Sequence, residues 1–328
     1  MREPWFWRND SLSAKAITVA LTPFSAAYQA GQRLHWMTTK PVSAGVPVIC
    51  IGNASLGGIG KTPFALMVEK FLRSEGLRCA FLTRGHGGAE AGPLLVDPQT
   101  HFANDVGDEA LLLAQHAPTI VARDRPAGAR LAVQSGAGVI IMDDGFQNPS
   151  LKKDCSILLV GADEKTEHQK TFPAGPYRET FRSAAARADI IVTMGDEKNA
   201  DERDDYYAWL EPVAPSPERV FAFAGIGKPQ RFFAMLNRLG YEVVERAAFP
   251  DHHPFSEAEL KVLARMAERL NARPICTEKD FVRLPADFRE RTLTLPVEMR
   301  VSDPEGLKRR LTDCIAAAKK QRDNDGNG

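Results

Sequence analysis

A glycine-rich segment that ends in lysine and threonine is the part of this chain whose residue types most directly indicate chemistry. Small residues let a backbone curl until its N–H groups point at phosphate oxygens, and a helix that begins there adds positive potential. Lys61 is expected to reach the β- and γ-phosphates of a nucleotide, and the Thr62 hydroxyl to take a Mg²⁺ position. The predicted nucleotide-binding residues are Ser55, Leu56, Gly57, Gly58, Ile59, Gly60, Lys61 and Thr62.

The flanking sequence supports a phosphate-binding loop over a plain glycine-rich turn with an exposed lysine. An apolar run typical of a β-strand, 46–51, precedes the loop, and a helix is predicted from Pro63 to Leu72. Ser55 stands where the GxxxxGK[ST] pattern has its first glycine, but three glycines remain in the loop. A strand before and a helix after, both at the right distance, are much rarer together than the short motif alone.

Two adjacent carboxylates, Asp143 and Asp144, follow a second apolar run at Val139–Met142. Enzymes with a phosphate-binding loop use such a carboxylate to hold Mg²⁺ or its water shell opposite the loop threonine. Side chains of successive strand residues point to opposite faces, so one of the two should face the nucleotide, and the pattern does not say which. The alternative is a capped strand end without a metal.

Other candidate groups lie between the predicted elements. Asp108 begins a helical run, where an aspartate by itself is more often a helix cap than a base. The triplet Asp-His-His at 251–253 lies in a turn, and the proline-fixed loop at 173–179 presents Arg178 and Glu179. The box Thr-Glu-Lys-Asp at 277–280 resembles a guanine-reading motif, but its lysine comes one position late, so GTP is not predicted.

These groups need a scaffold, and alternating strands and helices predict a parallel, doubly wound α/β sheet with sites at the carboxyl ends of its strands. After Pro212 a proline-rich stretch predicts a linker to a second, smaller α/β unit. The predicted further strands are 79–83, 157–160, 190–193, 220–224, 241–244, 274–276 and 292–301, with helices at 229–239, 256–270 and 304–319. The predicted parts are therefore an N-terminal helix in 1–40, a nucleotide-binding core in 41–212, the smaller unit in 213–320 and a disordered tail in 321–328.

The first 40 residues combine aromatic side chains with a basic surplus. Three of the four tryptophans lie in the first 36 residues, and residues 1–40 hold five Lys or Arg against two Asp or Glu. Ile17, Leu21, Phe24, Tyr28 and Gly31 recur at helical spacing. The charge-free span 16–32 is too short and too polar for a membrane-crossing helix. The pattern fits equally a helix in a membrane interface and one packed on the protein surface.

Composition sets the broad class. The 328 residues are 44% hydrophobic and 26% charged, with 42 basic against 42 acidic side chains, so no global field favours nucleic acid. The five cysteines are scattered and lack CxxC spacing, which indicates reduced core residues in a cytosolic protein.

Eight motifs occur in an order that resembles the tetraacyldisaccharide 4′-kinase (lipid A 4′-kinase) family. They are GGIGKTP, TRGHGG, GDEALL, DDGFQN, PAGPYRE, FAGIGKPQRFF, FPDHHPF and TEKD, between Gly57 and Asp280, and the resemblance as a whole spans roughly residues 3 to 300. The resemblance implies phosphoryl transfer, dependent on ATP and Mg²⁺, to the 4′-hydroxyl of a lipid A disaccharide 1-phosphate. It also implies a two-domain fold and peripheral attachment to the cytoplasmic face of a Gram-negative inner membrane. We further expect a monomer.

The resemblance also assigns roles to single residues. It implies that Lys61 and Thr62 take nucleotide and metal, that Asp108 is the base for the sugar hydroxyl and that His252 is its partner across the domain interface. It places Asp143 and Asp144 near the metal, and Arg178 and Glu179 at the active site. Two positions depart from the family pattern: Asn148 stands where many relatives have histidine, and His86 where tyrosine is frequent.

Two other classes remain open at this point. A switch or assembly ATPase of the partition type would carry a signature lysine just before the paired glycines, and this chain has Leu56 there. The other is a soluble small-molecule kinase with an N-terminal packing helix. Partition of a variant that lacks residues 1–40 between membrane and cytosol would distinguish it.

Overall fold

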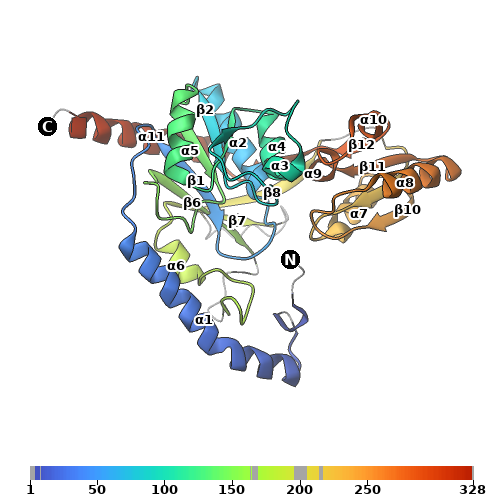
Figure 1. Ribbon diagram of the computed structural model, residues 1–328, viewed down its shortest axis with the longest axis horizontal. Helices are drawn as coiled ribbons and strands as arrows, with labels where there is room; N and C mark the ends of the chain where they lie inside the picture. Colours follow the sequence, from blue (N-terminus) through green and yellow to red (C-terminus); the bar gives the residue numbers. More distant parts are fainter. Residues whose placement is uncertain are drawn as a thin grey trace.

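A nine-stranded sheet forms the centre of the computed structural model, which describes residues 4–7, 9–162, 164, 169–195, 205–213 and 217–326. The strands run in the order β13-β8-β7-β6-β1-β5-β2-β4-β3 (Figure 1). Neighbours are parallel except for the two outermost pairs, β13–β8 and β3–β4. The bounds are β1 Val48–Asn53, β2 Cys79–Thr83, β3 Leu94–Leu95, β4 Thr119–Val121, β5 Val139–Asp143, β6 Cys155–Gly161, β7 Ile190–Met194, β8 Tyr206–Pro212 and β13 Val297–Val301.

Helices cover both faces of this sheet, which confirms the predicted doubly wound α/β fold. Strand β1 is buried along its whole length, as expected for a central parallel strand. Its Ile49 and Ile51 pack toward α2 (Lys61–Ser74), α4 (Asp108–Ala114) and α11 (Pro304–Gly326). Its Val48 and Cys50 pack toward α5 (Arg125–Gln134) and α6 (Phe181–Ala185). Two shorter helical segments complete this part, η1 Trp5–Trp7 and α3 Ala103–Val106.

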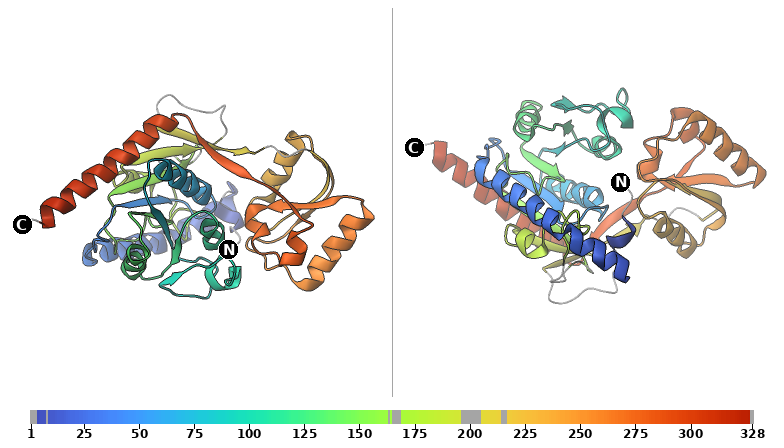
Figure 2. Two further views of the ribbon diagram at one scale, coloured as in Figure 1. Left: turned by 90° about the horizontal axis from the view of Figure 1, so that it is seen from above. Right: turned by 60° about the horizontal axis from the view of Figure 1, so that its bottom comes forward.

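A separate four-stranded parallel sheet, in the order β10-β9-β11-β12, forms the smaller unit at the right of Figure 1. Helix α7 covers one face and helix α8 the other, and the two views of Figure 2 show the unit set beside the large sheet. The bounds are β9 Arg219–Ala224, α7 Pro229–Arg238, β10 Glu242–Ala248, α8 Glu257–Arg269, β11 Arg273–Thr277, α9 Glu278–Phe281, α10 Ala286–Arg289 and β12 Leu293–Leu295.

The end of the chain differs from the prediction. The run 292–301 was predicted as one strand of the smaller unit, but Pro296 separates it into β12 and β13, and β13 pairs with β8 of the large sheet. Proline has no N–H for a strand ladder, which explains the break. Helix α11 then buries Leu307 and Leu311 in the core of the large sheet. Residues 297–326 therefore pack with the nucleotide-binding core, and not with the smaller unit that the predicted range 213–320 describes.

The predicted disordered tail, 321–328, is wrong for most of its length, because α11 continues to Gly326. Arg322 ties this last part to the core: its guanidinium lies 2.6 Å from Asp154 Oδ2 and donates to the carbonyl oxygen of Val46 at 3.1 Å. Residues 327–328, and the predicted linker residues 214–216, lie outside the described residues.

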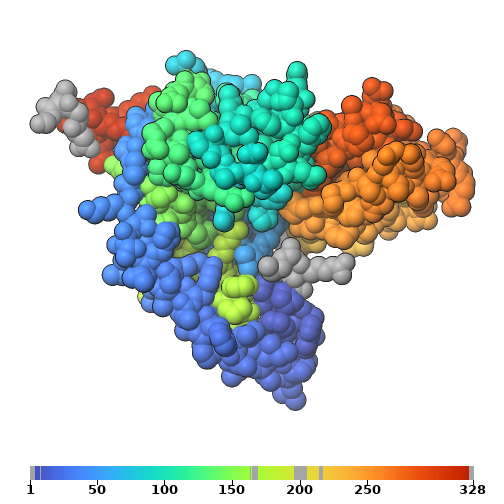
Figure 3. All heavy atoms as spheres, in the orientation of Figure 1, coloured from blue at the N-terminus to red at the C-terminus, as the bar shows by residue number. Residues whose placement is uncertain are grey.

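Helix α1 (Leu12–Thr38) lies along the lower edge of the molecule, beside the segment that leads into α6 (Figures 1 and 3). Ile17, Leu21 and Tyr28 of the predicted stripe are partly buried, whereas Gly31 is exposed and Phe24 is 64% exposed. The most buried side chains of α1 are Ala14, Thr18 and Ser25. Ser25 Oγ donates to Thr171 O at 2.8 Å. Among the described residues no helix is long and apolar enough to cross a membrane.

Candidate active site

The turn between β1 and α2 has the shape that a phosphate-binding loop requires. Gly60 immediately precedes α2 with φ of +95°, where a side chain would be strained and its Cβ would lie 3.1 Å from Met194 Cε. Asn53 Nδ2 donates to both O and Oγ of Ser55, each at 3.0 Å, and Lys61 Nζ donates to Asn53 Oδ1 at 3.1 Å. The side chain of Ser55, at the position that departs from the motif, thus closes the start of the loop against Asn53.

The first part of the loop is held by the segment 173–179. The amide of Leu56 donates to Pro176 O at 2.6 Å, and the amide of Arg178 donates to Ala54 O at 2.7 Å. The N–H of Leu56 is therefore already used within the protein. The backbone available to phosphate oxygens lies in 57–62, where α2 begins.

The acidic pair divides into two environments. Asp143 ends β5, is 1% exposed, and accepts from Thr62 Oγ1 at 3.4 Å. Asp144 has φ of +51°, which turns it out of the strand toward Arg178 and Lys61. The Arg178 guanidinium binds both oxygens of Asp144, at 2.9 and 3.3 Å, and Lys61 Nζ lies 3.6 Å from Oδ1. Asp143 and Asp144, which the sequence did not distinguish, therefore have different partners in the structure.

Asp143 has the features of a metal ligand. Its Oδ1 is buried and has no hydrogen-bond partner among the described residues. Burial, together with the nearby charge of Glu109, raises the pKa of Asp143 to about 7. A cation beside Thr62 and Asp143 would satisfy the unpartnered oxygen and favour ionisation. No group of three or more His, Cys, Asp or Glu that could hold a metal occurs in the described part of the chain.

Asp144 is ionised for a different reason. Burial opposes its charge, but Lys61 and the Arg178 guanidinium outweigh burial and hold the pKa of Asp144 below its usual range. Glu179, predicted at the active site with Arg178, points elsewhere. Its carboxylate accepts from Gln147 at 3.1 Å and from Arg187 at 2.8 Å. Gln147 Nε2 also donates to the carbonyl oxygen of Asn53, so Glu179 is linked through Gln147 both to Arg178 and to the start of the nucleotide loop.

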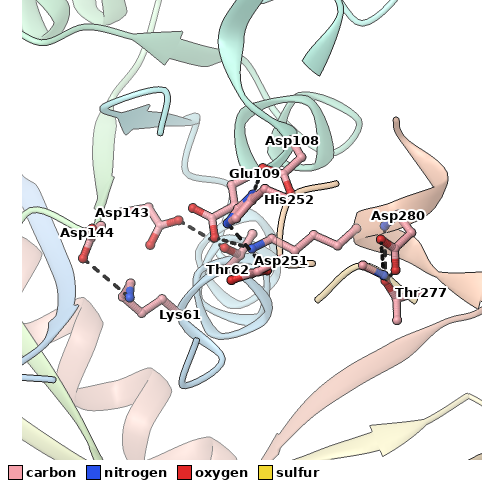
Figure 4. A network of polar contacts seen from close by, with 12 residues as sticks. Lys61, Thr62, Asp108, Glu109, Asp143, Asp144, Asp251, His252, Thr277 and Asp280 are labelled. Atoms are coloured by element: carbon pink, nitrogen blue, oxygen red, sulfur yellow. Dashed lines mark hydrogen bonds and ion pairs between the residues drawn. The ribbon is translucent and has the colours of Figure 1, made fainter. Parts of the chain in front are cut away.

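The second half of the site lies where the two units meet (Figure 4). Gly107 has φ of +87° and places Asp108 at the first position of α4, where its carboxylate is 3% exposed. His252 Nδ1 lies 3.1 Å from Asp108 Oδ1, which joins the two residues that were predicted as a pair. Arg283 of the smaller unit donates to the other oxygen, Asp108 Oδ2. The side chain of Arg283 is also buried, and it lies 3.1 Å from Asp280 Oδ1.

The environment of Asp108 favours the carboxylate form. Burial by itself would raise the pKa of Asp108, but the hydrogen bond from His252 and the charges of Lys279 and Arg283 lower it below the usual range. Next to Asp108, Glu109 accepts from Lys279 Nζ at 2.7 Å. His252, Lys279 and Arg283 of the smaller unit thus contact the two acidic residues that begin α4, Asp108 and Glu109.

Sequence reasoning missed several residues of this site: Asn53, Glu109, Gln147, Lys279 and Arg283. Lys279 lies within the box at 277–280 and Arg283 follows it. In this box Thr277 caps α9, because its Oγ1 accepts from the amide of Asp280, and Asp280 Oδ1 accepts from the amide of Gly225. The structure also shows the contacts of His86 and Asn148, the two residues that depart from the family pattern. The ring of His86 packs edge-on against that of His252 at 5.7 Å, and Asn148 Oδ1 accepts from the amide of Ser150 at 2.9 Å.

Comparison with known proteins decides between the remaining classes. The family profile described as tetraacyldisaccharide-1-P 4′-kinase matches residues 17–316. The chain belongs to the tetraacyldisaccharide 4′-kinase family. A tetraacyldisaccharide 4′-kinase of Rhodospirillum centenum is 44% identical, and the alignment covers 96% of this chain and 97% of the relative. One of Hyphomonas neptunium is 42% identical over 98% of this chain and 100% of the relative.

Among solved structures, that of LpxK from Aquifex aeolicus in complex with ATP resembles this one with a TM-score of 0.75. The two chains are 26% identical, and the match covers 91% of this chain and 99% of the Aquifex chain. A tetraacyldisaccharide 4′-kinase is an ATP-binding kinase of lipid A biosynthesis, so the predicted enzyme class is confirmed and the switch ATPase is set aside.

Proposed function

We propose that this protein transfers the γ-phosphate of ATP to the 4′-hydroxyl of tetraacyldisaccharide 1-phosphate. The observation that carries the proposal is the arrangement in Figure 4, in which a phosphate-binding loop and the Asp108–His252 pair lie at one junction between the two units. Phosphoryl transfer depends on position and on neutralisation of charge more than on covalent chemistry. The junction provides both, because it joins a nucleotide loop to groups that can accept a proton.

On the nucleotide side, we assign phosphate binding to Lys61 and the backbone of 57–62. Thr62 and Asp143 would hold Mg²⁺, which neutralises phosphate charge when it is bound. The ion pair between Asp144 and Arg178 would keep Lys61 directed at the loop, since Asp144 is the carboxylate within 3.6 Å of its ammonium group.

On the acceptor side, we assign proton acceptance to Asp108 and His252 together. A sugar hydroxyl is a weak nucleophile, so loss of its proton to a base assists attack on the phosphate. His252 binds one oxygen of Asp108 and Arg283 the other, and each carboxylate oxygen keeps a second lone pair with which it can accept the hydroxyl proton. His252 orients the carboxylate and shares the charge that develops.

We also propose that the protein acts as a monomer attached to the cytoplasmic face of the inner membrane through α1. Four large apolar side chains, Leu12, Val19, Leu34 and Met37, are exposed at 88%, 71%, 62% and 84%. Their spacing of seven, fifteen and three residues places them on one side of α1, opposite the packed Ser25. Such a stripe suits a helix that lies in a membrane interface.

The test is to incubate the purified protein with Mg²⁺, γ-labelled ATP and the lipid disaccharide 1-phosphate in mixed micelles. Label should appear in the lipid and be lost in Lys61→Ala. Release of free phosphate without labelled lipid would contradict the proposal and would indicate an ATPase that hydrolyses ATP without transfer to lipid.

A further inference from the structure

A cavity of about 300 Å³ lies at the end of α1, apart from the site described above. Trp36 reaches it from α1, Phe146, Lys152 and Lys153 from the segment between β5 and β6, and Arg187 from the end of α6. The cavity contains no residue of the nucleotide loop, the acidic pair or the Asp108–His252 pair. Its volume is at the lower end of the range for small-ligand sites.

Two cations are held against two aromatic rings in this cavity. Lys153 Nζ lies 5.0 Å from the centre of the Trp36 ring and 5.7 Å from that of Phe146. The guanidinium carbon of Arg187 lies 4.8 and 5.3 Å from the same two centres. The rings attract both positive groups and keep them close together, although like charges repel. The result is a preorganised pair of cations.

The cavity has more positive than negative charge. Arg187 pairs with Glu179 at 2.8 Å. Lys153 Nζ donates to Phe146 O at 2.8 Å, and Lys152 Nζ to the neutral side chain of Gln321 at 3.4 Å. Within the described ranges neither lysine has a carboxylate in ion-pair distance. Burial lowers the pKa of Lys153, as expected for a cation short of a counter-charge. An anion in the cavity would supply it.

The surroundings of the cavity indicate which anion. The apolar side chains of Pro41, Pro149 and Leu151 line the cavity, and Val42, next to Pro41, is 46% exposed. Val42 is hydrogen-bonded to the segment that carries the lysines, since the amide of Lys152 donates to Val42 O at 2.9 Å. A free phosphate ion would gain nothing from this apolar border, whereas a phosphate that carries acyl chains would.

We propose that this cavity binds the phosphate headgroup of a membrane phospholipid. Lys153 and Arg187 contact the phosphate oxygens, Lys152 adds a third positive charge at the cavity, and the acyl chains extend along Pro41 and Val42. This lipid is a ligand in addition to the kinase substrate, and its binding does not depend on phosphoryl transfer. The protein would then recognise an anionic membrane surface through a defined site as well as through the apolar stripe of α1.

Flotation of the full-length protein with vesicles tests the proposal. The probes are vesicles of phosphatidylcholine alone and of phosphatidylcholine mixed with phosphatidylglycerol. Lys153→Met removes the charge and keeps most of the chain over the rings, and Lys152→Gln changes a partly exposed side chain that the fold does not need. Each should weaken binding to the mixed vesicles roughly fivefold, the equivalent of about 1 kcal/mol per basic residue at an anionic surface. Lys261→Gln on α8, with the same change of charge, should match the wild type.

The remaining outcomes would overturn the proposal. Wild-type affinity of Lys152→Gln and Lys153→Met for the mixed vesicles would mean that the cavity does not hold a phospholipid. If inorganic phosphate raises the Tm of the wild type but not of Lys153→Met while vesicle binding is equal, the ligand is free phosphate. If instead the KM for the lipid substrate rises in neutral detergent micelles while vesicle binding is equal, the cavity holds the substrate's own phosphate. Vesicle binding can be measured whether or not kinase activity is found.

Discussion

Replacement of Asp108 is the sharpest test of the proposed mechanism. We expect Asp108→Ala to lower kcat by ~10²–10⁴, the usual contribution of a general base, which corresponds to about 3–5 kcal/mol of transition-state stabilisation. The nucleotide loop is untouched by this change, so the affinity for ATP should stay near that of the wild type. Asp108→Asn keeps the shape of the side chain and should lose a similar factor, because an amide does not accept the proton.

The structure also predicts what Asp108 contributes to stability. The side chains of Asp108 and Arg283 are 3% and 5% exposed, so solvent screens their attraction little. Without Asp108, the Arg283 guanidinium still has Asp280 and the carbonyl oxygen of Gly225 as hydrogen-bond partners. We therefore expect Asp108→Ala to lower the free energy of unfolding by about 1–3 kcal/mol, the usual contribution of a hydrogen bond to a charged group.

The pH dependence has a definite sign. Because the pKa of Asp108 is lower in the folded protein than in the unfolded chain, its carboxylate stabilises the fold above the unfolded value of about 3.9. This contribution to stability is lost as the pH falls through the pKa that Asp108 has in the folded protein. Urea titrations of Asp108→Asn should therefore approach those of the wild type at acid pH and differ from them at neutral pH.

Single-turnover assays with labelled ATP and micellar lipid, run beside the urea titrations, separate chemistry from folding. Lys279→Gln is the matched control, because it removes the neighbouring contact with Glu109 and leaves Asp108 in place. Its loss in kcat should be clearly smaller than that of Asp108→Ala. Normal turnover in Asp108→Ala would refute the base role. Equal losses in both variants would mean that docking of the smaller unit, and not proton acceptance, explains the effect.

Three further predictions concern the rest of the site and α1. Lys61→Ala should abolish transfer and weaken ATP binding at least tenfold by calorimetry (about 1.4 kcal/mol for one lost phosphate contact); unchanged binding would remove Lys61 from the phosphate site. Asp143→Asn should raise the Mg²⁺ concentration for half-maximal rate far more than Asp144→Asn, because only Asp143 has a buried oxygen without a partner among the described residues; the reverse order would exchange their roles. Leu34→Glu combined with Met37→Glu should move the protein from the membrane to the soluble fraction after cell lysis, and persistent sedimentation with membranes would contradict attachment through α1.

The elements that hold the nucleotide loop could be predicted from local pattern. Strand β2 has its predicted bounds, and β5, β6 and β7 differ from prediction only at their ends, because buried parallel strands are continuous apolar runs. Strand β4 was not predicted because it has only three residues. Helix α5 was not predicted either: it contains Gly128, where a Cβ would lie 2.6 Å from Ala122 Cβ, so close packing on β4 outweighs a low helix propensity.

The sequence by itself determined the phosphate-binding loop, the doubly wound fold and the family, because each depends on short segments whose residue types act locally or in a fixed order. Only the tertiary structure decided which partners each carboxylate has. Asp143 and Asp144 are neighbours in sequence, and a single positive φ sends them to different partners. Asp108, His252 and Arg283 meet only because two units of the chain dock at one edge, and contacts over such distances have no local pattern. The same docking of distant segments places Trp36 over Lys153 and Arg187.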